Sequence, residues 1–163
     1  MIYIFRAALQ RIVSEVSQAN HVETGGILLG VRLLSGDFII THATSPGPNA
    51  VKMPCNFQKD VQYNLHIMNI LYRKYSVDYL GEWHKHPNNH VNYSSKDSSS
   101  MLYISKINRN PCFFIIVGDS YYIDDLKKHI NLFIVNNFGV VINDDWQITD
   151  IPEELAEEKG ILS

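Results

Sequence analysis

The start of the chain contains two kinds of apolar spacing, and each predicts a different element. Residues 1–5 form a short run rich in β-branched and aromatic side chains, which predicts a strand. Over residues 7–18 the apolar positions instead return every three or four residues, which predicts an amphipathic helix. The apolar positions of this helix are Leu9, Ile12, Val13 and Val16. We therefore expect a strand that leads directly into a helix.

Two further apolar runs, at residues 27–34 and 38–41, flank a Ser-Gly-Asp turn. Short apolar runs on both sides of a tight turn predict an antiparallel hairpin. Residues 45–49 have the sequence Ser-Pro-Gly-Pro-Asn, in which the two prolines fix φ and lack an amide hydrogen. No helix can pass through this segment, so we expect a rigid loop there.

The middle of the chain contains the clearest long helix. Apolar side chains recur at helical spacing over residues 58–75, and residues 77–86 then have the composition of a strand. A polar loop follows. Ser94 and Asp97 lie where a hydroxyl and a carboxylate favour the start of a helix, so a second helix is predicted from there to about residue 107.

The last third of the chain is predicted to be mainly strand. Residues 112–117 are continuously apolar, as in a buried strand, and residues 130–135 and 140–142 flank an Asn-Asn-Phe-Gly turn, as in a hairpin. From about residue 144 the chain is acidic and weakly periodic. The proline and two glutamates that begin at residue 152 suit the first turn of a short last helix.

Length and composition fit one folded domain. With 163 residues, 45% hydrophobic and 19% charged, the chain can bury a core, so we expect a single α/β (α+β) domain over residues 1–163 with an acidic tail from about 144. The net charge of -3 argues against nucleic acid as a partner. No apolar run approaches the roughly 20 residues of a membrane helix, and the start lacks a signal-peptide pattern, so we expect a cytoplasmic protein. Cys55 and Cys112 lie in no metal or disulfide pattern and are expected in the core.

The strand that ends near residue 86 carries the candidate chemistry. His84 and His86 lie two residues apart, and because strand side chains alternate between faces, both imidazoles are expected on one face. Pro87 ends the strand, so the following loop can turn back and bring Asp97 towards them. Two nitrogens and one oxygen leave a fourth tetrahedral position for water, as in a catalytic zinc site.

These residues form a pattern that resembles the JAMM zinc metalloprotease family, also called the JAB or MPN domain. The family motif is His-x-His-Pro, six residues, then Ser-x-x-Asp, and residues 84–97 match it without a gap. Residues 23–30, Glu-Thr-Gly-Gly-Ile-Leu-Leu-Gly, resemble the motif of the family's first strand, in which a glutamate precedes a glycine-bounded apolar run. The resemblance extends over about residues 1–142 and implies a cytidine-deaminase-like fold with a curved mixed sheet flanked by helices.

The resemblance also implies a role for each motif residue. One Zn²⁺ per chain would be bound by His84, His86 and Asp97. Glu23 would be the general base that takes a proton from water and passes it to the leaving amine. Ser94 would stabilise the oxyanion.

Three neighbouring residues have less defined roles. Glu82 lies on the same strand face as the two histidines, so alternation alone makes it a rival for the base, although the family pattern favours Glu23. Glu82 is then interpreted as a supporting or hydrogen-bonded group. His90 lies in the loop between the ligands and is assigned a surface or hydrogen-bonded role. Trp83 alternates away from the ligands and is expected in the core.

The chain resembles the compact prokaryotic members of the family, rather than the eukaryotic deubiquitinases, through residues 79–84, residues 44–48 and Phe57. Some of these proteins are encoded beside E1-like and E2-like enzymes, including those of CD-NTase-associated antiphage operons. The resemblance thus implies an isopeptidase whose substrate is a ubiquitin-like protein or CD-NTase conjugate with an extended C-terminal tail, with an E1/E2-like operon partner. The alternatives are a metallopeptidase acting on a sulfur-carrier protein and a non-catalytic MPN scaffold.

Overall fold

The computed structural model describes residues 1–108, 111–119, 122–136 and 138–150. In chain order, the elements are β1 (Ile2–Phe5), α1 (Arg6–Gln18), β2 (Thr24–Arg32), β3 (Phe38–Ala43), β4 (Val51–Met53), β5 (Asn56–Gln58), α2 (Val61–Tyr75), β6 (Asp78–Lys85), the 3₁₀ turn η1 (Pro87–Asn89), α3 (Ser95–Asn108), β7 (Cys112–Val117), α4 (Ile123–Leu126), β8 (Ile130–Asn136), β9 (Gly139–Ile142) and β10 (Trp146–Thr149).

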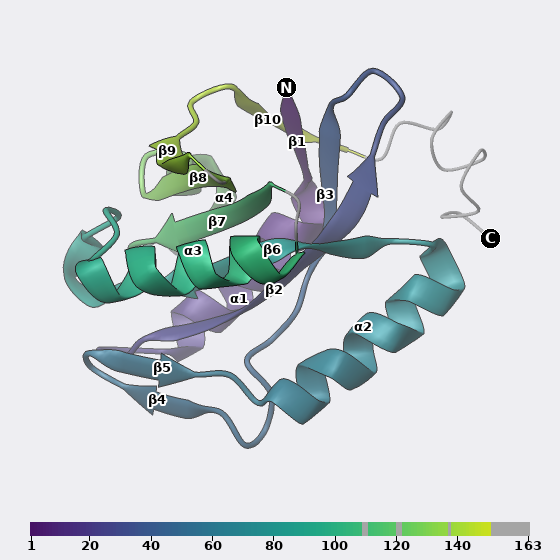
Figure 1. Cartoon of the computed structure of the whole chain (residues 1–163). Coiled ribbons are helices and arrows are strands. Elements are labelled where there is room, and N and C mark those ends of the chain that lie inside the picture. Colours follow the sequence, from purple (N-terminus) through teal and green to yellow (C-terminus); the bar gives the residue numbers. More distant parts are fainter. Residues whose placement is uncertain (109–110, 120–121, 137, 151–163) are drawn as a thin grey trace.

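A curled mixed sheet of eight strands forms the centre of the molecule (Figure 1). The strand order is β10-β1-β3-β2-β6-β7-β8-β9. β1 pairs in parallel with β10 and β3, and β6 pairs in parallel with β7, whereas the remaining neighbours are antiparallel. β4 and β5 form a separate two-stranded ribbon that leads into α2. The α/β fold with a curved mixed sheet is therefore confirmed.

The sheet separates two apolar cores, because successive side chains of a strand point to opposite faces. β7 illustrates this alternation. Phe113 and Ile115 share one core with α1, whereas Phe114 and Ile116 share the other with Met101 of α3. Since β6 lies beside β7 in the middle of the sheet, its side chains alternate between the same two sides.

Most elements lie where the apolar pattern predicts them. The N-terminal strand and helix are β1 and α1, the first hairpin is β2 and β3, and β7 has the predicted bounds. The long helix, however, begins at Val61 and not near residue 58. Asn56–Gln58 pair with β4, and the Asp60 carboxylate caps the helix by accepting a hydrogen bond from the Tyr63 amide at 3.1 Å.

Two predictions for the core and the tail are wrong. Trp146–Thr149, which the sequence pattern places in the acidic, weakly periodic tail, form the strand β10, which pairs in parallel with β1 and buries Trp146. Cys55 is exposed, because it lies in the turn between β4 and β5, whereas Cys112 is buried as predicted. The short helix expected from residue 152 lies outside the described residues.

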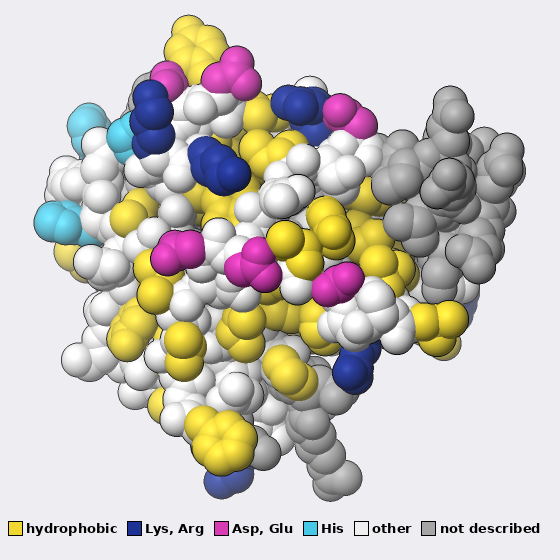
Figure 2. Space-filling model, turned by 90° about the horizontal axis from the view of Figure 1, so that it is seen from above, with side chains coloured by type: hydrophobic (Ala, Val, Ile, Leu, Met, Phe, Trp, Pro, Cys, Tyr) yellow, Lys and Arg dark blue, Asp and Glu magenta, His cyan; other side chains and the backbone are white. Residues whose placement is uncertain are grey.

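Charges are mixed over the surface seen in Figure 2, where the lysine and arginine side chains stand among acidic and apolar ones. None of the described helices is long and apolar enough to cross a membrane.

Candidate metal centre

The two histidines of the motif converge at the end of β6. His84 lies within the strand and His86 directly after it, where the His86 amide donates a hydrogen bond to the Val117 carbonyl at 2.9 Å. This bond keeps the chain extended through His86, so the alternation of side chains continues beyond the strand. The Nε2 atoms of His84 and His86 are 2.7 Å apart, so both imidazoles point to the same place.

Asp97 reaches the same place from the first turn of α3. Its Oδ1 is 3.5 Å from His84 Nε2, and its Oδ2 is 3.4 Å from His86 Nε2. Ser94 fixes this turn as a capping box: its hydroxyl accepts from the Asp97 amide at 3.2 Å, and its amide donates to the carboxylate at 2.6 Å. The Ser94 hydroxyl is also 2.6 Å from Asp97 Oδ2, so the structure places this hydroxyl against the carboxylate.

The three donors fit a single cation. One ligand atom from each of His84, His86 and Asp97 lies within 4.8 Å of the others, and tetrahedral zinc separates its ligands by about 3.3 Å. His86 Nδ1 is 2.8 Å from the His90 carbonyl, a partner that fixes the proton on Nδ1 and leaves the Nε2 lone pair free. The His90 side chain is exposed, as predicted, and it is the His90 backbone carbonyl that binds His86.

Electrostatics favours a positive ion at this place. Burial lowers the pKa of His84 to about 4, so this imidazole is a neutral donor at pH 7. Burial opposes a charge on His86, but the hydrogen bond and charge of Asp97, the His90 carbonyl and the charge of Glu23 together outweigh this effect and raise the pKa of His86. Burial likewise opposes a charge on Asp97, yet hydrogen bonds from His86 and Ser94 lower the pKa of this carboxyl. A metal ion would compete with the His86 proton for the same lone pair.

Glu23 approaches the same place from the neighbouring strand. β2 and β6 are antiparallel with Thr24 opposite Lys85, so the next position along the register puts Glu23 beside His86. Residues opposite each other in an antiparallel pair project to the same face. Burial raises the pKa of Glu23, and the charge of Asp97 adds to this rise, whereas His86 and Lys96 lower it.

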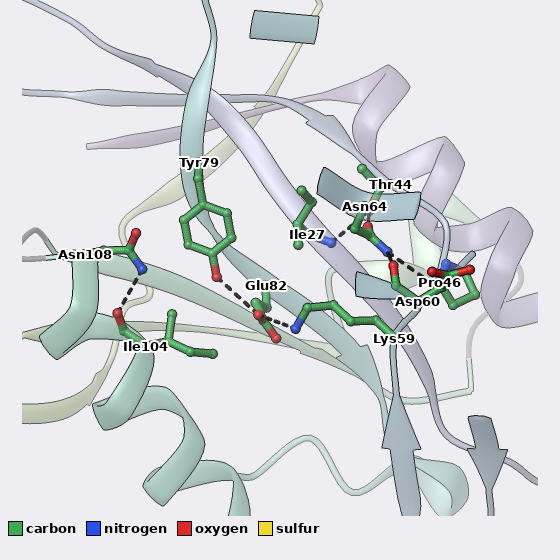
Figure 3. Close-up of polar contacts among 10 residues, drawn as sticks. All are labelled: Ile27, Thr44, Pro46, Lys59, Asp60, Asn64, Tyr79, Glu82, Ile104 and Asn108. Carbon is green, nitrogen blue, oxygen red and sulfur yellow. Dashed lines mark hydrogen bonds and ion pairs between the residues drawn. The ribbon is translucent and has the colours of Figure 1, made fainter. Parts of the chain in front are cut away.

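Glu82 shares the sheet face of the histidines but is already paired (Figure 3). Its Oε1 accepts a hydrogen bond from Lys59 Nζ at 2.5 Å and from the Tyr79 hydroxyl at 3.2 Å. Lys59 was not singled out in the sequence, because nothing local shows that it meets a glutamate 23 residues away. Glu82, which strand alternation alone made a candidate base, is therefore already bound in an ion pair.

A cleft of about 560 Å³ runs beside the site and is lined by two of the three donors, His84 and Asp97. Glu23, His84 and Asp97 line one part of it, and the Lys59–Glu82 pair lines another. Its apolar walls come from β5, α3 and β7 through Phe57, Met101, Ile104 and Phe114. Trp83, in contrast, is buried on the other side of β6 as predicted, with its indole nitrogen donating to the Thr44 carbonyl at 3.0 Å.

Comparison with known sequences gives consistent matches. A family described as prokaryotic homologs of the JAB domain matches residues 5–129. A CD-NTase/cGAS isopeptidase from Escherichia coli (strain TW11681) is 30% identical over 98 residues, which cover 59% of this chain and 62% of that protein. A protein with the same name from Enterobacter hormaechei subsp. hoffmannii (strain UCI 50) is 31% identical over 121 residues, covering 72% of this chain and 67% of that protein.

A probable metalloprotease, y4qB, from Sinorhizobium fredii (strain NBRC 101917 / NGR234) is 28% identical over 90 residues, covering 54% of this chain and 55% of that protein. The matches thus span from 55% to 67% of the length of these three relatives. Among solved structures, the solution structure of protein DSY2949 from Desulfitobacterium hafniense has a TM-score of 0.67 at 18% identity. It covers 94% of this chain and 97% of that chain, and at this identity the likeness shows a common fold.

Proposed function

The chain belongs to the family of prokaryotic JAB domains, and from this premise we propose that it is a zinc-dependent isopeptidase. Its substrate would be a protein joined through an extended C-terminal tail to an amine, of the ubiquitin-like or CD-NTase type. The observation that carries the proposal is the convergence of His84, His86 and Asp97, with Glu23 directly before the adjacent strand β2 and beside an open cleft.

The donor set fits zinc better than magnesium or calcium, because two imidazole nitrogens suit zinc whereas the other two ions prefer oxygen. Zinc bound by His84, His86 and Asp97 would act as a Lewis acid and make water a nucleophile at neutral pH. The ligand positions do not depend on a loop alone, because β6 and a capped helix turn support them.

Glu23 is proposed as the general base. Its carboxylate would take the proton of the attacking water and return it to the nitrogen of the leaving amine, so that the amine departs neutral. A pKa raised by burial suits a group that must first accept and then donate a proton near neutral pH. Glu82 is less suited to this role, because its lone pairs accept from Lys59 and Tyr79.

Ser94 is proposed to stabilise the oxyanion. In the structure its hydroxyl is hydrogen-bonded to Asp97, so this role would require the hydroxyl to turn towards the substrate oxygen. Its capping of α3 is a second contribution, because it holds Asp97 in place.

The cleft supports the choice of substrate. Its apolar walls and its Lys59–Glu82 pair can bind an extended peptide, and two relatives carry the name CD-NTase/cGAS isopeptidase. An operon partner resembling an E1 or E2 enzyme would supply the conjugate. A sulfur-carrier protein with a processed tail is the alternative substrate, and a metal-free scaffold is the alternative to an enzyme.

The test combines metal analysis with a cleavage assay. Protein purified without added metal should contain about one zinc per chain, and it should release a CD-NTase or a ubiquitin-like protein from a lysine conjugate. Glu23→Gln should retain zinc and lose about 10²–10⁴ in rate. The matched variant Glu82→Gln should lose far less.

The possible results separate the parts of the proposal. Full activity of zinc-loaded Glu23→Gln would refute the base. Cleavage of a sulfur carrier's linear tail, with no cleavage of branched conjugates, would replace the substrate class. Purified protein without zinc or activity would favour the scaffold.

A further inference from the structure

Lys85 lies between the two histidine ligands but points to the opposite side of β6. Its side chain is 1% exposed, which is rare for a lysine, because burying an ammonium group is costly unless it is fully paired. Nothing in the proposed chemistry uses this residue, so its burial requires another explanation.

Three oxygens surround the Lys85 ammonium group. It donates to the Ala19 carbonyl at 3.0 Å and to the Asn20 carbonyl at 3.4 Å, and it is 2.7 Å from Asp119 Oδ1. The three oxygens match its three N–H donors. Ala19 is the C-cap of α1, where the backbone carbonyls have no hydrogen-bond donor within the helix. The ammonium group supplies donors to the carbonyls at this helix end.

Each partner of Lys85 belongs to a segment that leads to the site. Ala19 and Asn20 begin the short connection that ends at Glu23. Asp119 follows β7, and its amide donates to Asn89 Oδ1 at 2.6 Å. Asn89 lies in η1, next to the residue whose carbonyl binds His86 Nδ1. One buried ammonium group thus connects the segment of the base, the ligand strand and the ligand loop.

We infer that Lys85 is a positioning residue that holds Glu23 in register with the metal ligands from behind the sheet. This inference rests on the proposed function of Glu23. β2 and β6 already pair at Thr24 and Lys85, but Glu23 lies beyond the end of the paired register. The Glu23 amide donates to the Met53 carbonyl of the short β4, and the Lys85 contacts with Ala19 and Asn20 connect the preceding segment to β6.

The variant Lys85→Met tests the inference, because methionine retains most of the side-chain volume and removes the charge. We expect zinc content to be unchanged, kcat to fall about 10–100-fold and KM to stay within about twofold, as for groups that orient a catalytic shell. Lys85→Met/Asp119→Asn, which removes the unpaired carboxylate as well, provides a second variant if the first folds poorly. Lys128→Met, which removes an exposed ammonium group, is the matched control and should be unchanged.

Two readouts distinguish positioning from a purely structural role. In a Glu23→Gln background, Lys85→Met should lower kcat less than about twofold, because a residue that acts through Glu23 has nothing left to orient. Hydrogen exchange of residues 19–24 should accelerate at least about tenfold in Lys85→Met, while Cys112–Val117 keeps its protection.

An equal loss of kcat with and without Glu23, or unchanged exchange at residues 19–24, would overturn the inference. If wild-type protein cleaves no conjugate, the proposed function fails, but the exchange measurement still decides whether Lys85 holds the Glu23 segment.

Discussion

Asn64 is a buried amide that connects α2 to the loop after β3, and its replacement by leucine should destabilise the fold. Its side chain is 2% exposed although three apolar residues of the same helix, Val61, Leu65 and Tyr72, are exposed. The Asn64 Oδ1 accepts from the Thr44 hydroxyl at 2.5 Å (Figure 3). Its Nδ2 donates to the Pro46 carbonyl at 3.2 Å and to the Asp60 carbonyl at 3.0 Å.

The size of the effect follows from these three hydrogen bonds. Each contributes about 1 kcal/mol net, so Asn64→Leu should lower the free energy of unfolding by about 3 kcal/mol. The two carbonyls keep a second donor, because the Asp60 amide also binds Pro46 and the Asn64 amide also binds Asp60. The Thr44 hydroxyl loses its acceptor but still accepts from the Ile27 amide. For a chain of this length, a loss of 3 kcal/mol lowers Tm by roughly 6–12 °C.

Urea unfolding followed by circular dichroism measures the effect. Asn108→Leu is the matched control, because Asn108 is exposed on α3 and its Nδ2 donates to the Ile104 carbonyl at 2.9 Å (Figure 3). It should change stability by less than about 0.5 kcal/mol. Thr44→Val combined with Asn64→Leu should cost about 1 kcal/mol less than the sum of the two single variants, since they share one bond. Equal stabilities of Asn64→Leu and Asn108→Leu would refute the reasoning.

Three further predictions concern the metal, a glycine and acid stability. Asp97→Ala should lose most of its zinc, as measured by elemental analysis, and unchanged zinc would remove Asp97 from the site. Gly81→Ala should prevent soluble expression or greatly lower Tm, because φ is +152° and a Cβ would lie 1.8 Å from the Phe113 carbonyl oxygen. Gly139→Ala, with a φ of +133° but nothing within 4 Å, is the control and should cost only about 1 kcal/mol. Burial lowers the pKa of His42 in the folded protein. As the pH drops below about 6.5, the unfolded chain therefore binds a proton at His42 more readily than the folded protein does, and the free energy of unfolding should fall. The stability of His42→Gln should fall less on acidification than that of the wild-type protein. An identical dependence of stability on pH in the variant and the wild type would contradict this prediction.

The sequence by itself determined most of the elements and brought together the three candidate donors. The pattern of β7 is local, since six consecutive apolar residues suffice to predict a buried strand. The donors could be predicted for the same reason. His84 and His86 follow from strand alternation, and Asp97 from a helix start eleven residues beyond His86, so the whole set lies within one continuous segment.

Only the tertiary structure decided which glutamate lies beside the donors and which one is bound in an ion pair. Strand alternation placed Glu82 on the face of the two histidines, whereas only the family resemblance pointed to Glu23. The fold pairs Glu82 with Lys59, and the register of β2 against β6 brings Glu23 beside His86. Neither pairing has a local signal, because both join segments that meet through the sheet.

The lack of a local signal also explains why the structure differs elsewhere from the predictions made from the sequence. Trp146–Thr149 became a strand because β1, at the other end of the chain, offered an edge to pair with. The oxygens that bind the Lys85 ammonium group come from the end of α1 and from the loop after β7, so nothing in the sequence around Lys85 predicts its burial. Periodicity reports which face a residue occupies along its own element, whereas pairing between distant segments depends on a register that exists only once the chain has folded.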